Sequence, residues 1–249
     1  AHPRGQRFGF RTLTVRFTDT TAHRMAEGLR AAKEAHVAIL AHGCVPRAES
    51  WVDALLAPLT DSAIGVIGPK LVRRNDTIAA AGLLIDPRRG IVPWFDGHDR
   101  ASRIHKLAAQ VVRNVTALPI DMWGIRRSTW DRIGPFDESL AASTQDLEWC
   151  LRAWENSMRV VCDATQEAWI GRNLRSTRLE SRLRARYSKW CNGDPFLGRG
   201  YRMRRIMGRE TPVLAVVDLA SQARRGNGEI DFSVARLSQD PELRPPSPA

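Results

Sequence analysis

Continuous apolar runs that alternate with helix-like stretches constrain the fold of this 249-residue chain more than any other feature. The runs Val37–Ala41, Ile64–Val72 and Met158–Cys162 have the length and the high apolar content of buried strands, although Lys70 and Arg159 interrupt the second and the third. Apolar residues at helical spacing precede the first of them, from about Ala22 to Glu34. Strands that alternate with helices predict an α/β fold, with a mixed sheet flanked by helices.

Further elements follow from the same patterns. We expect strands at Phe10–Phe17, Ile78–Asp86 and Val111–Ile120, helices at Pro46–Leu59 and Gln145–Asn156, and a long loop at Asp86–Arg103.

Composition divides the chain into three parts. Residues 1–171 carry the alternation and form the predicted α/β domain. Residues 172–222 are rich in arginine, and we expect a basic helical extension there. It would contain a helix at 172–190, an irregular stretch at 191–210, and a helix or buried segment from Thr211 to Gln222. Residues 223–249 end in a proline-rich stretch typical of a flexible tail.

The net charge of +11 comes from 38 lysine and arginine residues against 27 acidic ones. A surplus of this size suits a polyanionic partner such as an anionic membrane surface, a nucleic acid or the diphosphate of a nucleotide sugar. A bias toward arginine codons explains the surplus equally well. No helix-turn-helix, RNP, KH or zinc-finger pattern occurs, so nucleic acid is not an expected partner.

Neither an apolar run long enough to span a membrane nor a signal peptide is visible in the sequence. The four cysteines have no metal-binding spacing, and most lie within apolar runs, as buried thiols of a cytoplasmic protein do. We therefore expect a cytoplasmic protein, either free or peripheral to a membrane.

A tight turn and acidic residues stand just before one predicted helix. The turn lies in Ile133–Leu140, and Gln145–Arg152 follows with Asp146 and Glu148. An acidic residue where a helix begins is a suitable position for a general base. An ordinary helix start with acidic residues in its first turn explains the same spacing.

The block 133–152 resembles the "GGFDE … EDxDLCLR" signature of family 2 glycosyltransferases, which are inverting enzymes of the GT-A fold that use nucleotide sugars. The order of the preceding motifs is also similar to that family, at Met25–Ala32, Val37–Trp51, Ile64–Leu71 and Ile125–Arg127. The resemblance implies a GT-A-like mixed sheet and a nucleotide diphospho-sugar as donor.

Site residues are carried over through these motifs. The resemblance implies that Asp146 is the catalytic base that deprotonates the acceptor hydroxyl. It also assigns His98, in a loop near the acceptor, and Trp123 and Glu148 to substrate binding.

The metal site of the family is absent from the sequence. Ala41, His42 and Gly43 stand where the family carries the DxD carboxylates that bind Mg²⁺ or Mn²⁺, and Ile170 replaces the late metal-site histidine. We therefore expect no metal ligands and no metal cofactor.

Arginines could replace the metal, because bidentate arginine–phosphate contacts are strong. We expect Arg172 and Arg175 to bind the donor diphosphate, with Arg178 and Arg73–Arg74 as further candidates.

Family members open with a strand–helix–strand unit that holds the nucleotide base, and such a unit needs roughly 30 or more residues. The stretch before the helix at Ala22 is too short for it, so this unit is predicted to be missing or shortened. A protein partner would then supply the nucleotide-binding segment, or the chain is a fragment of a longer protein.

Three functions remain open. The first is a metal-independent or partner-dependent glycosyltransferase, whose arginines should lie with Asp146. The second is a catalytically inactive GT-A-like scaffold or regulatory subunit, whose cleft would be filled by Trp123 or Trp149. The third is a basic module that binds a membrane or nucleic acid through 172–189, with an exposed apolar edge at Leu179, Leu183 and Trp190.

Overall fold

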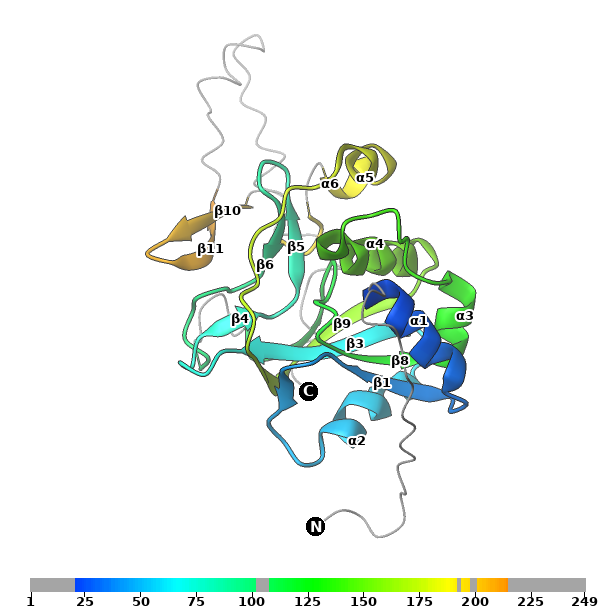
Figure 1. The fold of residues 1–249 in the computed structure, drawn as a ribbon. Helices are drawn as coiled ribbons and strands as arrows, with labels where there is room; N and C mark the ends of the chain where they lie inside the picture. The colour runs from blue at the N-terminus through cyan, green and yellow to red at the C-terminus, as the bar shows by residue number, and fades with distance from the viewer. Residues whose placement is uncertain (1–20, 102–107, 192–193, 198–200, 215–249) are drawn as a thin grey trace, which may run out of the picture.

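The computed structural model describes residues 21–101, 108–191, 194–197 and 201–214. They fold around a mixed sheet of seven strands, whose main path runs β1-β8-β3-β9-β2 (Figure 1). The predicted mixed sheet flanked by helices is confirmed. Its strands are β1 (His36–Leu40), β2 (Cys44–Pro46), β3 (Ile64–Val72), β4 (Ile78–Ala80), β7 (Val112–Asn114), β8 (Met122–Arg126) and β9 (Arg159–Ile170).

Helices cover both faces of this sheet, and alternate residues of the strands point to them. Figure 1 shows α1 (Thr21–Ala31), α3 (Arg127–Ile133) and α4 (Ala142–Glu155) above the sheet. The helix α2 (Trp51–Leu56) and the 3₁₀ turn η1 (Ala57–Thr60) lie below it. Val66 and Val160 pack in the upper core, whereas the next residues, Ile67 and Val161, pack in the lower one.

Strand β3 is the centre of the sheet and is buried along its whole length. It pairs antiparallel with β8 and parallel with β9. Two glycines permit close approach here, because a Cβ on Gly68 would lie 2.8 Å from the Met122 carbonyl oxygen and one on Gly124 would lie 2.9 Å from that of Leu55. The glycines therefore let β8 and α2 pack tightly against their neighbours.

Several boundaries differ from the sequence-based predictions. The helix expected from Pro46 begins only at Trp51, because Cys44–Pro46 pairs antiparallel with residues 168–170 of β9. The same pairing extends β9 to Ile170, well beyond the predicted Cys162. The strand expected over 111–120 is reduced to β7.

The loop predicted over 86–103 is partly regular. Its first residues complete a hairpin of β5 (Leu83–Asp86) and β6 (Gly90–Pro93), and both strands are buried. Gly90 has φ +83°, and a Cβ there would lie 2.3 Å from the Thr177 carbonyl oxygen. The hairpin thus packs directly on the segment that follows β9, and Ile91 N–H donates to that oxygen at 2.8 Å.

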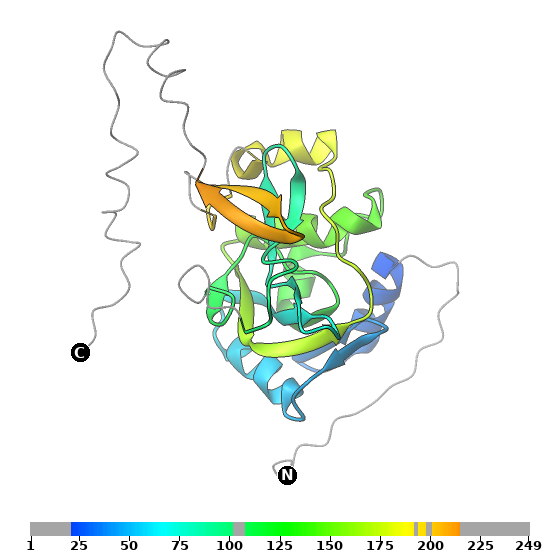
Figure 2. The same cartoon turned by 90° about the vertical axis from the view of Figure 1, so that its left-hand side faces the viewer.

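The basic extension is less helical than predicted. Residues 172–180 contain no helix, and α5 (Ser181–Arg186) and α6 (Ser188–Cys191) are the only helices in the described part of the extension. Residues 201–214, expected to be irregular and then helical, form the hairpin β10 (Tyr201–Ile206)–β11 (Arg209–Leu214), which Figure 2 shows in front of the β5–β6 hairpin.

The expected apolar stripe of this extension faces inward. Of its four residues, Leu179, Leu183 and Tyr187 are buried in the upper core, and Trp190 packs against that core partly buried. The division of the chain at residue 171 stays a prediction. The predicted strand Phe10–Phe17 and the predicted tail 223–249 lie outside the described residues.

Candidate active site

Asp146 lies on the buried face of α4. The helix begins at Ala142, three residues earlier than predicted, so Asp146 sits one turn inside it rather than at its start. The residue is 8 % exposed. The backbone N–H groups of Leu147 and Ile120 donate to its carboxylate, the first at 2.8 Å. The Asp146 side chain therefore links α4, to which it belongs, with the turn that precedes β8.

Burial changes the acidity of this carboxyl group. Desolvation raises the pKa of Asp146 from 3.8 to about 7, and the nearby charge of Asp121 adds to the rise. The two backbone donors and the Arg172 guanidinium oppose it, because they stabilise the ionised form. A carboxyl group with a pKa near 7 exchanges protons readily at neutral pH, as a general base must.

Asp121 and Arg172 form the second part of the site. Arg172 donates from Nε to Asp121 Oδ1 at 2.7 Å and from an Nη to Oδ2 at 2.5 Å, a bidentate pair. Asp121 is buried, whereas the Arg172 side chain is 53 % exposed. The hydrogen bonds to Asp121 raise the pKa of Arg172. The guanidinium is thus fixed at the surface as a permanent cation.

The position of these groups in the sheet is set by the strand ends. Strands β1, β3 and β9 run parallel to one another, and Arg172 follows the end of β9. The turn after β1 brings Ala41 N–H within 2.8 Å of the Asp121 carbonyl oxygen. Open α/β sheets bind ligands at this carboxyl end of their strands.

Cys44 borders the same groups. Its thiol is buried, and desolvation together with the charge of Asp121 raises its pKa to about 12. It is therefore a neutral packing residue at neutral pH, and a thiolate nucleophile is not available there.

The candidate site contains two buried acidic side chains, Asp121 and Asp146. His42 is exposed in the turn after β1 and Ile170 ends β9. Within the described part of the chain, no group of three or more histidine, cysteine, aspartate or glutamate side chains could hold a metal ion. The fixed cation at this edge is instead Arg172.

The rest of the block 133–152 is held by structural contacts. Glu148 is buried and accepts Arg152 Nε at 2.9 Å and the Tyr187 hydroxyl at 3.1 Å. Arg152 in turn donates to the carbonyl oxygens of Ile133 and Pro135. The turn, α4 and α5 are thus tied together through Glu148, whose predicted contact with substrate stays a prediction.

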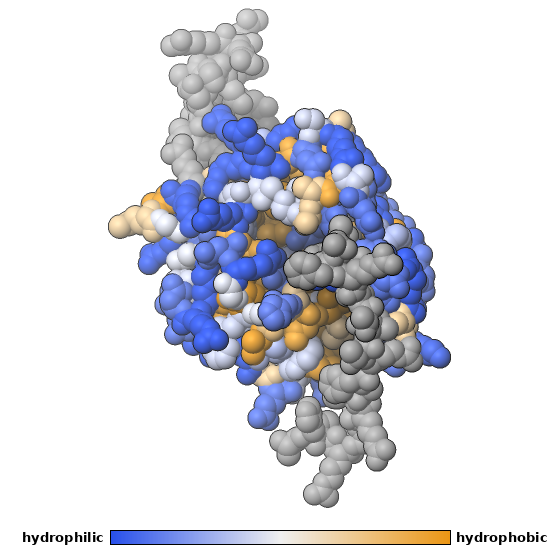
Figure 3. Space-filling model, viewed as in Figure 1, coloured by the Kyte–Doolittle hydropathy of each residue, from blue (hydrophilic) through white to orange (hydrophobic). Residues whose placement is uncertain are grey.

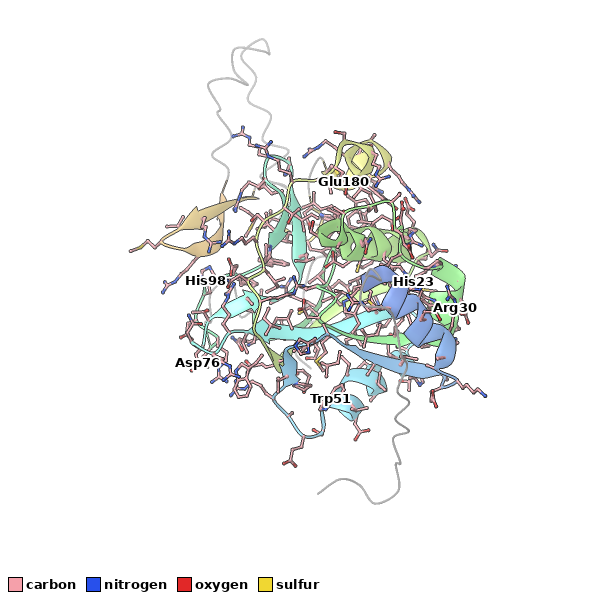
Figure 4. The ribbon with its side chains drawn as sticks, viewed as in Figure 1. His23, Arg30, Trp51, Asp76, His98 and Glu180 are labelled. Atoms are coloured by element: carbon pink, nitrogen blue, oxygen red, sulfur yellow. The ribbon has the colours of Figure 1, made fainter. Side chains whose placement is uncertain are left out.

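The other predicted site residues lie elsewhere. Trp123 is completely buried, with Nε1 donating to the Pro119 carbonyl at 2.8 Å and its ring 5.4 Å from that of Trp149. His98 lies beside β4 (Figure 4), buried at 6.1 Å from the Phe95 ring. Arg175 is exposed. The structure therefore brings together Asp146 and Arg172 and does not bring the other predicted residues into that pair.

The arginines named as further candidates are also separate. Arg73 donates to Asp96 at 2.5 Å, which fixes it beside the β5–β6 hairpin. Arg178 is exposed beyond Arg175 along the segment that follows β9.

Asp121 is the residue that sequence reasoning missed. It stands directly before the apolar run of β8, and an acidic residue at the start of a buried strand is a signal that could have been followed. Its partner Arg172 lies 51 positions away, so the pair itself is visible only in the fold.

Comparisons with known proteins give a limited result. No family profile matches the chain, and no curated protein matches its sequence. Among solved structures, it is similar to a crystal structure of GalNAc-T7 with UDP, GalNAc and Mn²⁺, with 13 % identity, a TM-score of 0.42 and coverage of 65 % of this chain and 32 % of that one. A197 from STIV has 11 % identity, a TM-score of 0.36 and coverage of 63 % and 75 %.

The chain thus spans about a third of the length of the GalNAc-T7 chain. None of the described helices is long and apolar enough to cross a membrane.

Proposed function

We propose that this chain carries the acceptor side of an inverting, family 2-like glycosyltransferase site. One observation carries the proposal: a buried carboxyl group with a pKa near 7 lies beside a fixed arginine at the carboxyl end of the sheet. Asp146 occupies the position where the sequence motif places the catalytic base. Arg172 provides a cation where the motif has lost its metal ligands.

The proposed reaction needs one base and one leaving group. Asp146 accepts the proton of an acceptor hydroxyl while that oxygen bonds to the anomeric carbon of the sugar. The bond from this carbon to the nucleoside diphosphate breaks on the opposite face, and the bonding pair leaves with the phosphate oxygen. Inversion of the anomeric configuration follows from this single displacement.

The leaving diphosphate requires positive charge. Asp121 engages Nε and one Nη of Arg172, which leaves the other edge of the guanidinium for a phosphate oxygen. Arg175 is exposed three residues further along and adds a second cation. Because arginine stays protonated at all physiological pH values, the charge does not depend on a metal.

The proposal has two further parts. The nucleotide base would be bound by a segment that a protein partner or a longer form of the chain supplies. His98, Trp123 and Glu148 would act on the substrate only after rearrangement, because each now makes packing or ion-pair contacts.

The second candidate function is a catalytically inactive scaffold or regulatory subunit. The replacement of the metal-binding motif by Ala41, His42 and Gly43 favours it. The membrane-binding alternative requires an exposed apolar edge, but Leu179 and Leu183 are buried and Trp190 packs partly buried against the same core.

Titration calorimetry with a panel of nucleoside diphosphates, with and without Mn²⁺, tests the proposal. We expect binding without metal that is lost in Arg172→Ala and partly retained in Arg172→Lys, while Arg132→Ala, which alters an exposed arginine on α3, serves as the matched control. Absence of binding under every condition would support the inactive subunit instead.

A further inference from the structure

The turn between β10 and β11 presents the most exposed large apolar side chain of the described residues. Met207 is 94 % exposed, and its neighbour Ile206 is 44 % exposed. Figure 3 shows apolar residues at the left-hand edge of the molecule, where Figure 1 places this hairpin. Single apolar side chains at a surface are common, so exposure alone indicates no function.

The turn holds Met207 in a conformation that suits another type of residue. Ile206 pairs with Arg209, so Met207 and Gly208 form a two-residue loop, and their φ angles are +47° and +78°. Positive φ at both positions defines a type I′ turn, for which Asn-Gly and Asp-Gly are the preferred sequences. A long side chain such as that of methionine is uncommon in this left-handed region. Neither turn chemistry nor burial therefore explains a methionine here, and such a mismatch is expected where a residue has a function.

Contacts with the rest of the molecule fix the hairpin. Met203 of β10 is buried, and its backbone N–H donates to Asp86 Oδ2 at 3.1 Å. At the turn, a Cβ on Gly97 would lie 2.3 Å from the Gly208 carbonyl oxygen, so the backbone of the turn packs directly against Gly97. A turn that is already fixed loses little conformational freedom when it binds a surface.

The hairpin is also basic. Residues 201–214 contain four arginines against one glutamate, which gives +3 in a chain of net charge +11. Arg205 and Arg209 lie on either side of the turn and are exposed. Asp96 accepts from Arg205 at 2.7 Å and from Arg73 at 2.5 Å, so one buried carboxylate balances only one of these two cations. The surface around the turn therefore carries excess positive charge.

We propose that this turn is a membrane contact, which inserts Met207 and Ile206 into the headgroup region of an anionic lipid bilayer. The arginines beside the turn stay with the lipid phosphates. A specific protein interface buries about 800 Å² on each partner, more than two side chains at a turn provide. The contact is weak and reversible, because it buries little apolar area. It does not use the segment 172–189, whose apolar side chains pack on the cores, and it does not depend on the proposed transfer activity.

Co-sedimentation of the full chain with lipid vesicles, without nucleotide, tests this contact. We expect binding to vesicles of phosphatidylserine and phosphatidylcholine in equal parts, little binding to phosphatidylcholine alone, and weaker binding at high salt. Met207→Asn should weaken vesicle binding on the order of tenfold. Because asparagine suits this turn, the same variant should not lower the urea midpoint of unfolding. Ile206→Thr, which keeps a β-branched residue in the strand, should also weaken vesicle binding.

Val112→Thr is the matched control, because it makes polar a side chain that is 55 % exposed on β7, a strand of the main sheet. This control should bind vesicles as the wild-type chain does. Absence of binding to the anionic vesicles, or equal binding by the wild-type chain and both turn variants, would overturn the proposal. Equal binding to anionic and neutral vesicles would also overturn it, because the arginines would then have no part. None of these results bears on nucleotide binding, which the calorimetry measures separately.

Discussion

Replacement of Asp146 by asparagine should stabilise the fold in a pH-dependent way. Burial raises the pKa of this carboxyl group from 3.8 to about 7, so the folded state disfavours its ionised form. One pKa unit corresponds to about 1.4 kcal/mol, and a shift of about 3 units amounts to about 4 kcal/mol. Asparagine has nearly the same shape, can still accept from Leu147 N–H and carries no charge.

The sign follows from proton binding. Between pH 3.8 and about 7 the folded chain holds a proton on Asp146 that the unfolded chain has lost, so the free energy of unfolding falls as pH rises. The contribution is fully present below the unfolded pKa and is lost above the folded one. About 2 of the 3 units lie above pH 5, so the free energy of unfolding of Asp146→Asn, relative to the wild-type chain, should grow by about 3 kcal/mol between pH 5 and pH 8.

Urea unfolding of the wild-type chain and the variant at both pH values measures this difference. Asp137→Asn is the control, because Asp137 belongs to the same block and its hydrogen bond to Ser139 lowers its pKa instead. That variant should show no growing advantage above pH 5. An Asp146→Asn difference that is constant with pH, or a variant less stable at pH 8, would refute the assignment of a buried, proton-binding carboxyl group.

Other predictions follow from the same contacts. Transfer activity should rise with pH and level off above about 7, because Asp146 must be ionised to act as a base; a flat rate profile would exclude it from that role. Glu148→Gln should lower the free energy of unfolding by about 3 kcal/mol, because it leaves Arg152 without the negative charge of its buried partner Glu148. Denaturant titration measures this loss, and a negligible loss would contradict the prediction. Gly90→Ala should cost at least about 2 kcal/mol, since the residue has φ +83° and its Cβ would meet Thr177; an unchanged melting temperature would argue against this packing.

The sequence predicts the central strands well. The largely apolar run Ile64–Val72 predicts a buried strand, and the structure has β3 at that position. The sequence does not reveal those strand and helix boundaries that depend on pairing between distant segments. The spacing predicts a helix from Pro46, but Cys44–Pro46 pairs with β9, and this pairing also lengthens β9 to Ile170.

The basic segment after β9 shows the limit of periodicity. Leu179, Leu183 and Tyr187 have helical spacing, yet only the part from Ser181 onward is helical. The preceding residues are held extended by Thr177, which bonds to Ile91 of the β5–β6 hairpin. That contact joins residues 86 positions apart, so local sequence could not reveal it.

The sequence indicated two of the three residues of the candidate site. The motif identified Asp146, and the excess of arginine near the end of β9 identified Arg172. The link between them, Asp121, depends on how the turn before β8 meets the end of β9. The raised pKa of Asp146 likewise depends on burial that only the packed fold creates.

Release of nucleoside diphosphate from nucleotide sugars in EDTA, with a panel of acceptors, tests the central claim most directly. The wild-type chain, together with its partner segment where one is required, should release the diphosphate without metal. Asp146→Asn should retain nucleotide binding by calorimetry and lose turnover. Turnover that persists in Asp146→Asn, or that appears only when Mn²⁺ is added, would contradict the account.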